Sequence, residues 1–162
     1  MKKKLLVLSS AILLLSIFAG CGSKDAKVKN DVAVTDVSAA VTAKLSDDAL
    51  VSVDADYIKG MMKMDVSDYD SYDVKINSKG VNIDEVGVFK AKDASQVATV
   101  EKAVKDYIQM RKDTWMVEYM PEERPKLDSA EVKTLGNYVI YVILPDDDKA
   151  AALDAFTKAL TA

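Results

Sequence analysis

Paired carboxylates, or serine with lysine, are the side chains of this chain that could carry out chemistry. The 162 residues include 26 Asp and Glu, one Cys and no His. His-based triads, His metal ligands and His proton shuttles are therefore excluded. No glycine-rich phosphate-binding loop occurs, and we expect no cofactor. The adjacent carboxylates Asp84 and Glu85 are the pair that a hydrolase could use, but no motif identifies a catalytic residue.

A second group of carboxylates could bind a cation instead. Asp65, Asp68, Asp70 and Asp73 lie close together, and calcium prefers oxygen ligands of this kind. The segment lacks both the D-x-D-x-D-G spacing and the closing Glu of an EF-hand loop. A solvated acidic loop over 65–72 is the favoured interpretation, so we predict no metal site.

The single thiol follows an apolar segment near the N-terminus. Lys2, Lys3 and Lys4 precede an apolar stretch over 5–18. This stretch is shorter than the roughly 20 residues of a membrane span and has the order of a secretory signal. Phe18-Ala19-Gly20-Cys21 resembles the lipobox of bacterial lipoproteins, although Phe18 stands where leucine is preferred. The resemblance implies that residues 1–20 are a signal peptide and that Cys21 carries lipid.

Removal of the signal would leave an acidic chain on the outer face of the cell membrane. Basic residues would fall to 19 against 26 acidic ones, and such a surface excludes nucleic acid as a partner. Membrane attachment would then come from the lipid on Cys21 rather than from surface charge. The polar stretch 21–31 is expected to be a flexible stalk, followed by a single domain over 32–162.

Helical spacing and alternation locate the first elements of that domain. Apolar residues predict a first helix over 36–46, and Asp54 can cap a short second helix. Val74 and Ile76 alternate with polar residues ahead of a turn-forming stretch. This pattern predicts a hairpin with strands over 72–78 and 83–91.

The second half of the domain predicts a long helix, a second hairpin and a final helix. Asp93 and Gln96 form a capping box that opens a helix over 94–118. Gly136-Asn137 suits a type II′ or I′ turn. The apolar run 138–144 predicts a central strand covered on both faces. Asp146 or Asp147 can cap the last helix.

These elements define the predicted fold class. The order is α-α-β-β-α-β-β-α, with two hairpins and about four strands in a mainly antiparallel sheet packed with helices. We therefore predict an α+β domain.

A short segment after the long helix is the candidate binding loop. Aromatic residues give a large contact area at low entropic cost, and prolines stiffen a loop. Termination of the helix is the competing interpretation of the same residues. The candidate loop consists of Tyr119, Pro121, Glu122, Glu123, Arg124 and Pro125.

The pattern from about 34 to 160 resembles a family of lipoproteins from low-GC Gram-positive bacteria, the domain-of-unknown-function family DUF4358. Tyr119 and Pro121 follow the long helix, and Gly136-Asn137-Tyr138-Val139-Ile140 enters the last strand. The resemblance also rests on a segment ahead of the long helix, Asn82-Ile83-Asp84-Glu85-Val86-Gly87-Val88-Phe89. The resemblance implies a lipoprotein with one small domain, and it brings no activity and no site residues.

Three classes of function remain open from the sequence. The leading hypothesis is a non-enzymatic binding or adaptor module that meets a cell-surface protein or a wall component. The alternatives are a carboxylate-dependent hydrolase of the cell envelope and an ion- or ligand-binding accessory of a transporter or sensor. The oligomeric state stays open.

Overall fold

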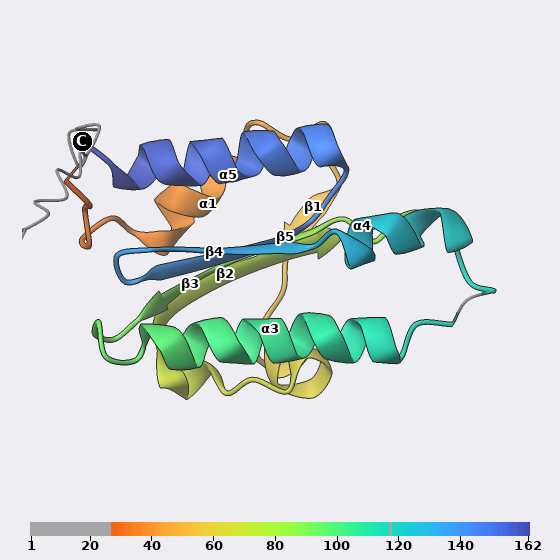
Figure 1. The fold of residues 1–162 in the computed structure, drawn as a ribbon, viewed down its shortest axis with the longest axis horizontal. Coiled ribbons are helices and arrows are strands. Elements are labelled where there is room, and N and C mark those ends of the chain that lie inside the picture. Colours follow the sequence, from red (N-terminus) through yellow and green to blue (C-terminus); the bar gives the residue numbers. More distant parts are fainter. Residues whose placement is uncertain (1–26, 117) are drawn as a thin grey trace, which may run out of the picture.

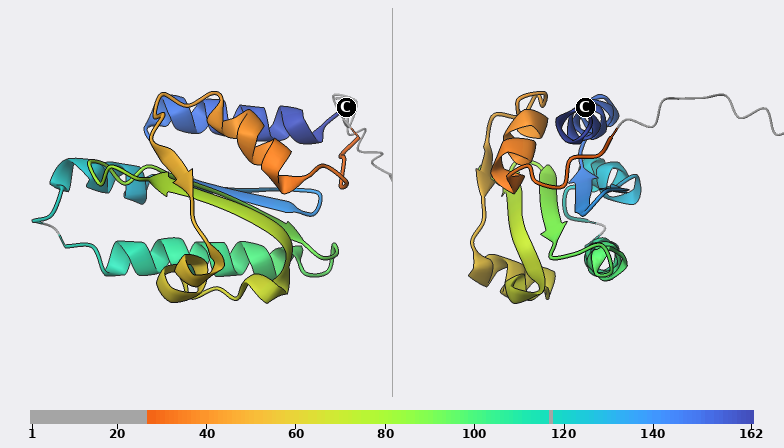
Figure 2. Two further views of the ribbon diagram at one scale, coloured as in Figure 1. Left: turned by 180° about the vertical axis from the view of Figure 1, so that it is seen from behind. Right: turned by 90° about the vertical axis from the view of Figure 1, so that its left-hand side faces the viewer.

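The computed structural model describes residues 27–116 and 118–162 and contains one sheet between two helical layers (Figures 1 and 2). The five antiparallel strands have the order β1-β2-β3-β5-β4. The strands are β1 (Leu50–Ser52), β2 (Tyr69–Asn77), β3 (Glu85–Ala91), β4 (Glu131–Leu135) and β5 (Tyr138–Ile143). The helices are α1 (Val34–Thr42), α2 (Ala55–Tyr57), α3 (Val97–Asp113), α4 (Arg124–Asp128) and α5 (Asp146–Leu160), with short turns of other types at η1 (Ile58–Met62), η2 (Val66–Asp68) and η3 (Pro121–Glu123).

The α+β class is confirmed, and so are the two hairpins β2–β3 and β4–β5. The sheet nevertheless has a fifth strand, because β1 pairs with the end of β2 through Leu50 and Asn77. Three residues are too few to show alternation, so β1 left no sequence signal. Gly136 has φ +57°, as a type II′ turn requires of its first central residue.

The two faces of the sheet bury two separate cores. Figure 2 shows α1 and α5 on one side of the sheet and α3 on the other. On β3, Val86 and Val88 contribute to the core under α1 and α5, whereas Phe89 contributes to the core under α3. This division follows from the period-2 alternation of a strand. Every residue of β5 is buried, as expected of a strand with helices on both faces.

Several predicted boundaries are wrong. The segment 65–72 is not all loop, because β2 already begins at Tyr69. The long helix covers Val97–Asp113 rather than 94–118. Asp93 accepts from the backbone and hydroxyl of Ser95 and forms a local turn, so the predicted capping box does not form. The first helix is α1, which begins and ends earlier than 36–46.

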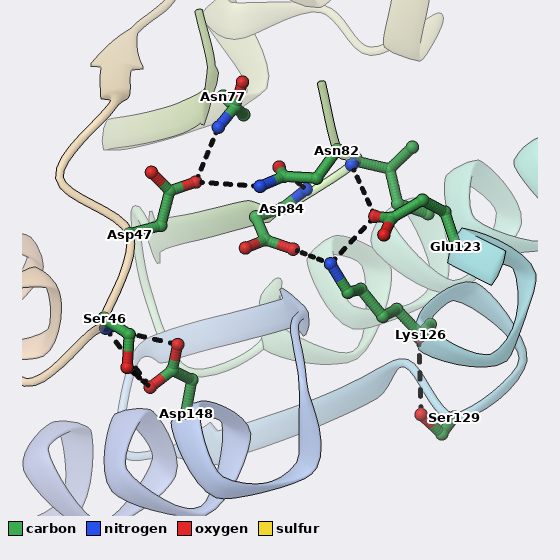
Figure 3. Close-up of polar contacts among 10 residues, drawn as sticks. Ser46, Asp47, Asn77, Asn82, Asp84, Glu123, Lys126, Ser129 and Asp148 are labelled. Carbon is green, nitrogen blue, oxygen red and sulfur yellow. Dashed lines mark hydrogen bonds and ion pairs between the residues drawn. The ribbon is translucent and has the colours of Figure 1, made fainter. Parts of the chain in front are cut away.

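The aspartates that open α5 also differ from the prediction. Pro145 occupies the N-cap position, and no described side chain caps this helix. Asp146 pairs with Lys149, and Asp148 accepts from the backbone N–H and hydroxyl of Ser46. Asp148 therefore ties the chain after α1 to the start of α5 (Figure 3).

The described chain begins with an arm that packs against the end of α5. Val28 forms an antiparallel bridge with Thr161, and Asn30 accepts from the backbone N–H of Asn137. Lys27 and Lys29, which lie in the predicted stalk, thus form backbone hydrogen bonds with Ala162 and Leu160 of the domain. Of the helices that the structure describes, none is long and apolar enough to cross a membrane.

Candidate functional site

A polar cluster lies at the end of the sheet where β2 ends and β3 begins (Figure 3). Asp84 and Glu85 are both almost fully buried there, with 4% and 2% of their surface exposed. Because they are adjacent on an extended chain, their side chains point to opposite faces of the sheet. The pair that the sequence singled out is therefore divided between two separate hydrogen-bond networks.

The outer network links Asp84 to α4. The Lys126 ammonium donates to Asp84 and to Glu123 at 2.8 Å each. Glu123 also accepts from the backbone N–H of Ile83 at 3.0 Å. Two carboxylates and one ammonium thus join the β2–β3 turn to η3 and α4, as Figure 3 shows.

Asp47 extends this network to the chain that precedes β1. Its carboxylate accepts from the side-chain amides of Asn77 at 2.7 Å and Asn82 at 3.4 Å. It also accepts from the backbone N–H of Ala49. Although burial opposes ionisation, these hydrogen bonds hold the pKa of Asp47 below its ordinary value.

The pKa of Asp84 is shifted in the opposite direction to that of Asp47. Burial raises the pKa of Asp84, and the hydrogen bond from Lys126 only partly offsets this effect. Burial by itself would lower the pKa of Lys126, but its bonds to Asp84 and Glu123 raise it above the ordinary value. Lys126 therefore stays protonated at neutral pH, while Asp84 ionises less readily than an exposed carboxyl group.

We expect Asp84→Asn to become more stable relative to the parent chain as pH rises. A raised folded-state pKa means that the folded protein holds the proton of Asp84 when the unfolded protein has released it, above the ordinary value of 3.8. The stability that Asp84 contributes is thus present at low pH and is lost as pH rises through its folded pKa. Urea denaturation between about pH 3.5 and 6 measures this difference.

Asp47→Asn is the matched control with the opposite sign. Because the pKa of Asp47 is lowered, its contribution is present above the ordinary value of 3.8 and is lost as pH falls. This variant should lose stability relative to the parent as pH rises. If the stability of both variants relative to the parent changed with pH in the same direction, the environments assigned to Asp84 and Asp47 would be wrong.

The inner network surrounds Glu85 beneath α3. The hydroxyl of Tyr107 donates to Glu85 at 2.8 Å and Arg111 donates to it at 2.6 Å, while the hydroxyl of Tyr141 makes a third bond. Arg111 also donates to the hydroxyl of Tyr107 at 2.8 Å. Burial raises the pKa values of both tyrosines, and Glu85 raises them further. Both tyrosines therefore remain hydrogen-bond donors, and Glu85 is held as an acceptor rather than left free as a base.

The two networks line one small pocket of about 140 Å³. Asp84, Glu85 and Arg111 contribute to its wall, together with Asn77 and Asn82. Pockets that bind drug-sized ligands measure about 300–1,000 Å³, so this one is too small for a ligand of that size. Among the described residues, no group of three or more Asp, Glu or Cys side chains is arranged to hold a metal ion.

The structure divides the candidate binding loop into an exposed part and a buried part. Tyr119 is 56% exposed, and Pro121 and Glu122 are also exposed. Glu123 is buried in the outer network. The segment is not a plain loop, because Pro121 opens η3 and Pro125 lies in the first turn of α4.

Arg124 supports the position of this segment. Its side chain donates to Asp128 at 2.8 Å and to the backbone carbonyl of Lys112 at 3.1 Å. It therefore ties α4 to the last turn of α3. Cys21, the predicted lipid attachment residue, lies outside the described residues.

Three charged residues of these networks were not identified from the sequence. Arg111 lies between the apolar residues Ile108 and Trp115, and a charged residue among apolar positions at helical spacing indicates a buried partner, so a signal was present. Lys126 and Asp47 lie in polar segments without a distinguishing pattern. Lys126 is bonded to Asp84 and Asp47 to Asn77, which are 42 and 30 residues away in sequence, so local patterns could not reveal these contacts.

Comparison with known proteins identifies one similarity. The family model described as a domain of unknown function (DUF4358) matches residues 43–144. The matched range includes the whole sheet and both networks, and it excludes α1 and α5. No curated protein and no solved structure matches the chain.

Proposed function

The chain belongs to the DUF4358 family of domains of unknown function, and from that premise we propose that it is a membrane-tethered, non-enzymatic binding module. Lipid on Cys21 anchors it to the extracytoplasmic face of the membrane. The end of the domain far from the anchor recognises a cell-surface protein or a wall component. The observation that carries the proposal is the position of exposed apolar side chains at that far end.

The path of the arm supports the orientation. The chain enters the domain at residue 27, beside the end of α5, whereas the connection between α3 and α4 lies at the opposite end (Figure 1). The chain from Cys21 to Lys27 can extend over about 20 Å at most. A lipid on Cys21 would therefore hold the arm near the membrane and direct the α3–α4 connection away from it.

The far end carries exposed apolar side chains, which we call the distal surface. It consists of Val81 and Met116, each 67% exposed, and Tyr119. Val81 lies in the β2–β3 turn, which Glu123 ties to η3 through Ile83. Exposed aromatic and methionine side chains are typical of recognition surfaces.

The segment that carries Tyr119 is held at both ends. Trp115 packs against the core under α3, and Glu123 is fixed by the outer network. Ordering these two ends in the free protein reduces the entropy that binding would cost. The ion pairs around Asp84 thus support a preorganised binding segment.

We expect Tyr119→Ala to reduce partner recovery about tenfold or more, since exposed aromatic anchors often dominate binding energy. The measurement is quantitative affinity capture of the tagged full chain from gently solubilised membranes, together with thermal unfolding. The melting temperature should stay unchanged because Tyr119 is exposed.

Two variants serve as controls for this capture experiment. Met61→Ala truncates a side chain that is 58% exposed on η1, and it should leave recovery unchanged. Cys21→Ala should release the chain from the membrane fraction, which separates failure of the tether from failure of the distal surface. Equal recovery by Tyr119→Ala and the parent chain would refute the proposed surface.

The hydrolase alternative has one observation in its favour, the raised pKa of Asp84 beside a pocket. Three observations oppose it. Lys126 already donates a hydrogen bond to Asp84, three donors surround Glu85, and the pocket measures only about 140 Å³. These contacts favour a binding module over an enzyme.

A further inference from the structure

A groove runs along α3, apart from the polar cluster and the distal surface. It comprises a hollow of about 400 Å³ and a second of about 300 Å³. Asp68, Tyr69 and Ala103 line both, so the two hollows are neighbours. We call this feature the α3 groove, and its size falls in the range of ligand-binding sites.

Tyr69 is the largest polar side chain that lines both hollows. Its side chain is only 7% exposed, and its ring is fixed edge-on against Phe89 at a centroid distance of 5.0 Å. The hydroxyl has no hydrogen-bond partner within the described part of the chain. Burial raises the pKa of Tyr69 to about 12, with further contributions from Asp68 and Asp65. The hydroxyl therefore stays protonated and can donate a hydrogen bond to a ligand.

A peptide backbone supplies an acceptor that the Tyr69 hydroxyl can use. Every residue of an extended chain offers a carbonyl oxygen, and Tyr69 lines both hollows. Gln96 also lines the second hollow, but its Oε1 atom is buried and is not accessible to a ligand there.

The walls of the larger hollow define which side chains would fit. Methionines form its apolar lining, and methionine adapts to varied apolar partners. Three carboxylates and one lysine line the same hollow. Lys63 is bonded to the backbone carbonyl of Gly60 at 2.6 Å and Asp106 is paired with Lys102, which leaves Asp65 and Asp68 without an ion pair among the described residues. The excess of negative charge favours a cationic ligand. The lining residues concerned are Met62, Met64, Met110, Asp65, Asp68 and Asp106.

We propose that the α3 groove binds an extended peptide segment of a partner protein, with an apolar side chain against the methionines and a Lys or Arg beside the carboxylates. A backbone carbonyl of the segment accepts a hydrogen bond from Tyr69. This site depends neither on the lipid anchor nor on the distal surface.

The test uses the full chain in a non-ionic detergent and the probe acetyl-Leu-Lys-Leu-Lys-amide. Titration calorimetry gives the affinity, and backbone NMR shifts locate the site. Tyr69→Phe removes only the hydroxyl and should weaken binding about threefold to tenfold. Tyr72→Phe is the matched control, because Tyr72 also stacks on Phe89 but lines neither hollow. That variant should bind as the parent does.

The remaining measurements identify which kind of ligand binds in the α3 groove. Acetyl-Leu-Glu-Leu-Glu-amide should bind at least tenfold more weakly than the lysine probe, and Asp68→Asn should reduce that difference. The peptide proposal is overturned if the lysine probe shows no saturable binding at millimolar concentration, if Tyr69→Phe binds it equally well, or if the shifts fall outside the groove. Equal binding of hexylamine would assign the groove to small amines, and shifts caused by self-association would assign it to a second copy; either result also overturns the proposal.

Discussion

Arg111→Met should lower the free energy of unfolding by about 3–5 kcal/mol, because breaking a buried ion pair leaves an uncompensated charge. Glu85 is 2% exposed, and Arg111 is its only cationic partner among the described residues. The substitution also removes the donor that Arg111 offers to Tyr107. Urea denaturation followed by circular dichroism measures the loss.

The double variant Glu85→Gln/Arg111→Met tests the cause of this loss. A neutral amide can still accept hydrogen bonds from Tyr107 and Tyr141, and it leaves no buried charge behind. We expect it to recover at least half of the stability that Arg111→Met loses. A loss below about 1 kcal/mol for the single variant would show that the pair behaves as a surface salt bridge.

Gly87→Ala should destabilise the domain by about 3 kcal/mol, at the upper end of ordinary overpacking effects. A Cβ atom at Gly87 would overlap the ring of Tyr141, with Cζ only 2.8 Å away. That ring cannot easily move, because Tyr141 is fully buried and its hydroxyl is bonded to Glu85. The melting temperature and the urea midpoint measure the effect.

Gly60→Ala is the control for the cost of the added methyl group. No described atom lies within 4 Å of a Cβ built at Gly60, and alanine has the higher helical propensity. This variant should be neutral or more stable by up to about 1 kcal/mol. Equal destabilisation by both glycine variants would mean that contact with Tyr141 is not the cause.

The candidate site was only partly predictable. The sequence identified Asp84 and Glu85 as a pair and Tyr119 to Pro125 as a separate binding segment. The structure joins Asp84 to Glu123 through Lys126 and leaves Glu85 on the other face of the sheet. Adjacency in a strand places side chains on opposite faces, so proximity in sequence was misleading for the pair.

By itself, the sequence determined the fold class, the two hairpins and the buried strand β5, because these depend on local features. The alternation around Val74, the Gly136-Asn137 turn and the apolar run 138–144 each act within a few residues. Only the tertiary structure decided the pairing of β1 and the partners of the buried charges. Arg111 and Lys126 reach carboxylates 26 and 42 residues away, and such contacts form because the folded sheet brings distant segments together and burial makes an unpaired charge too costly.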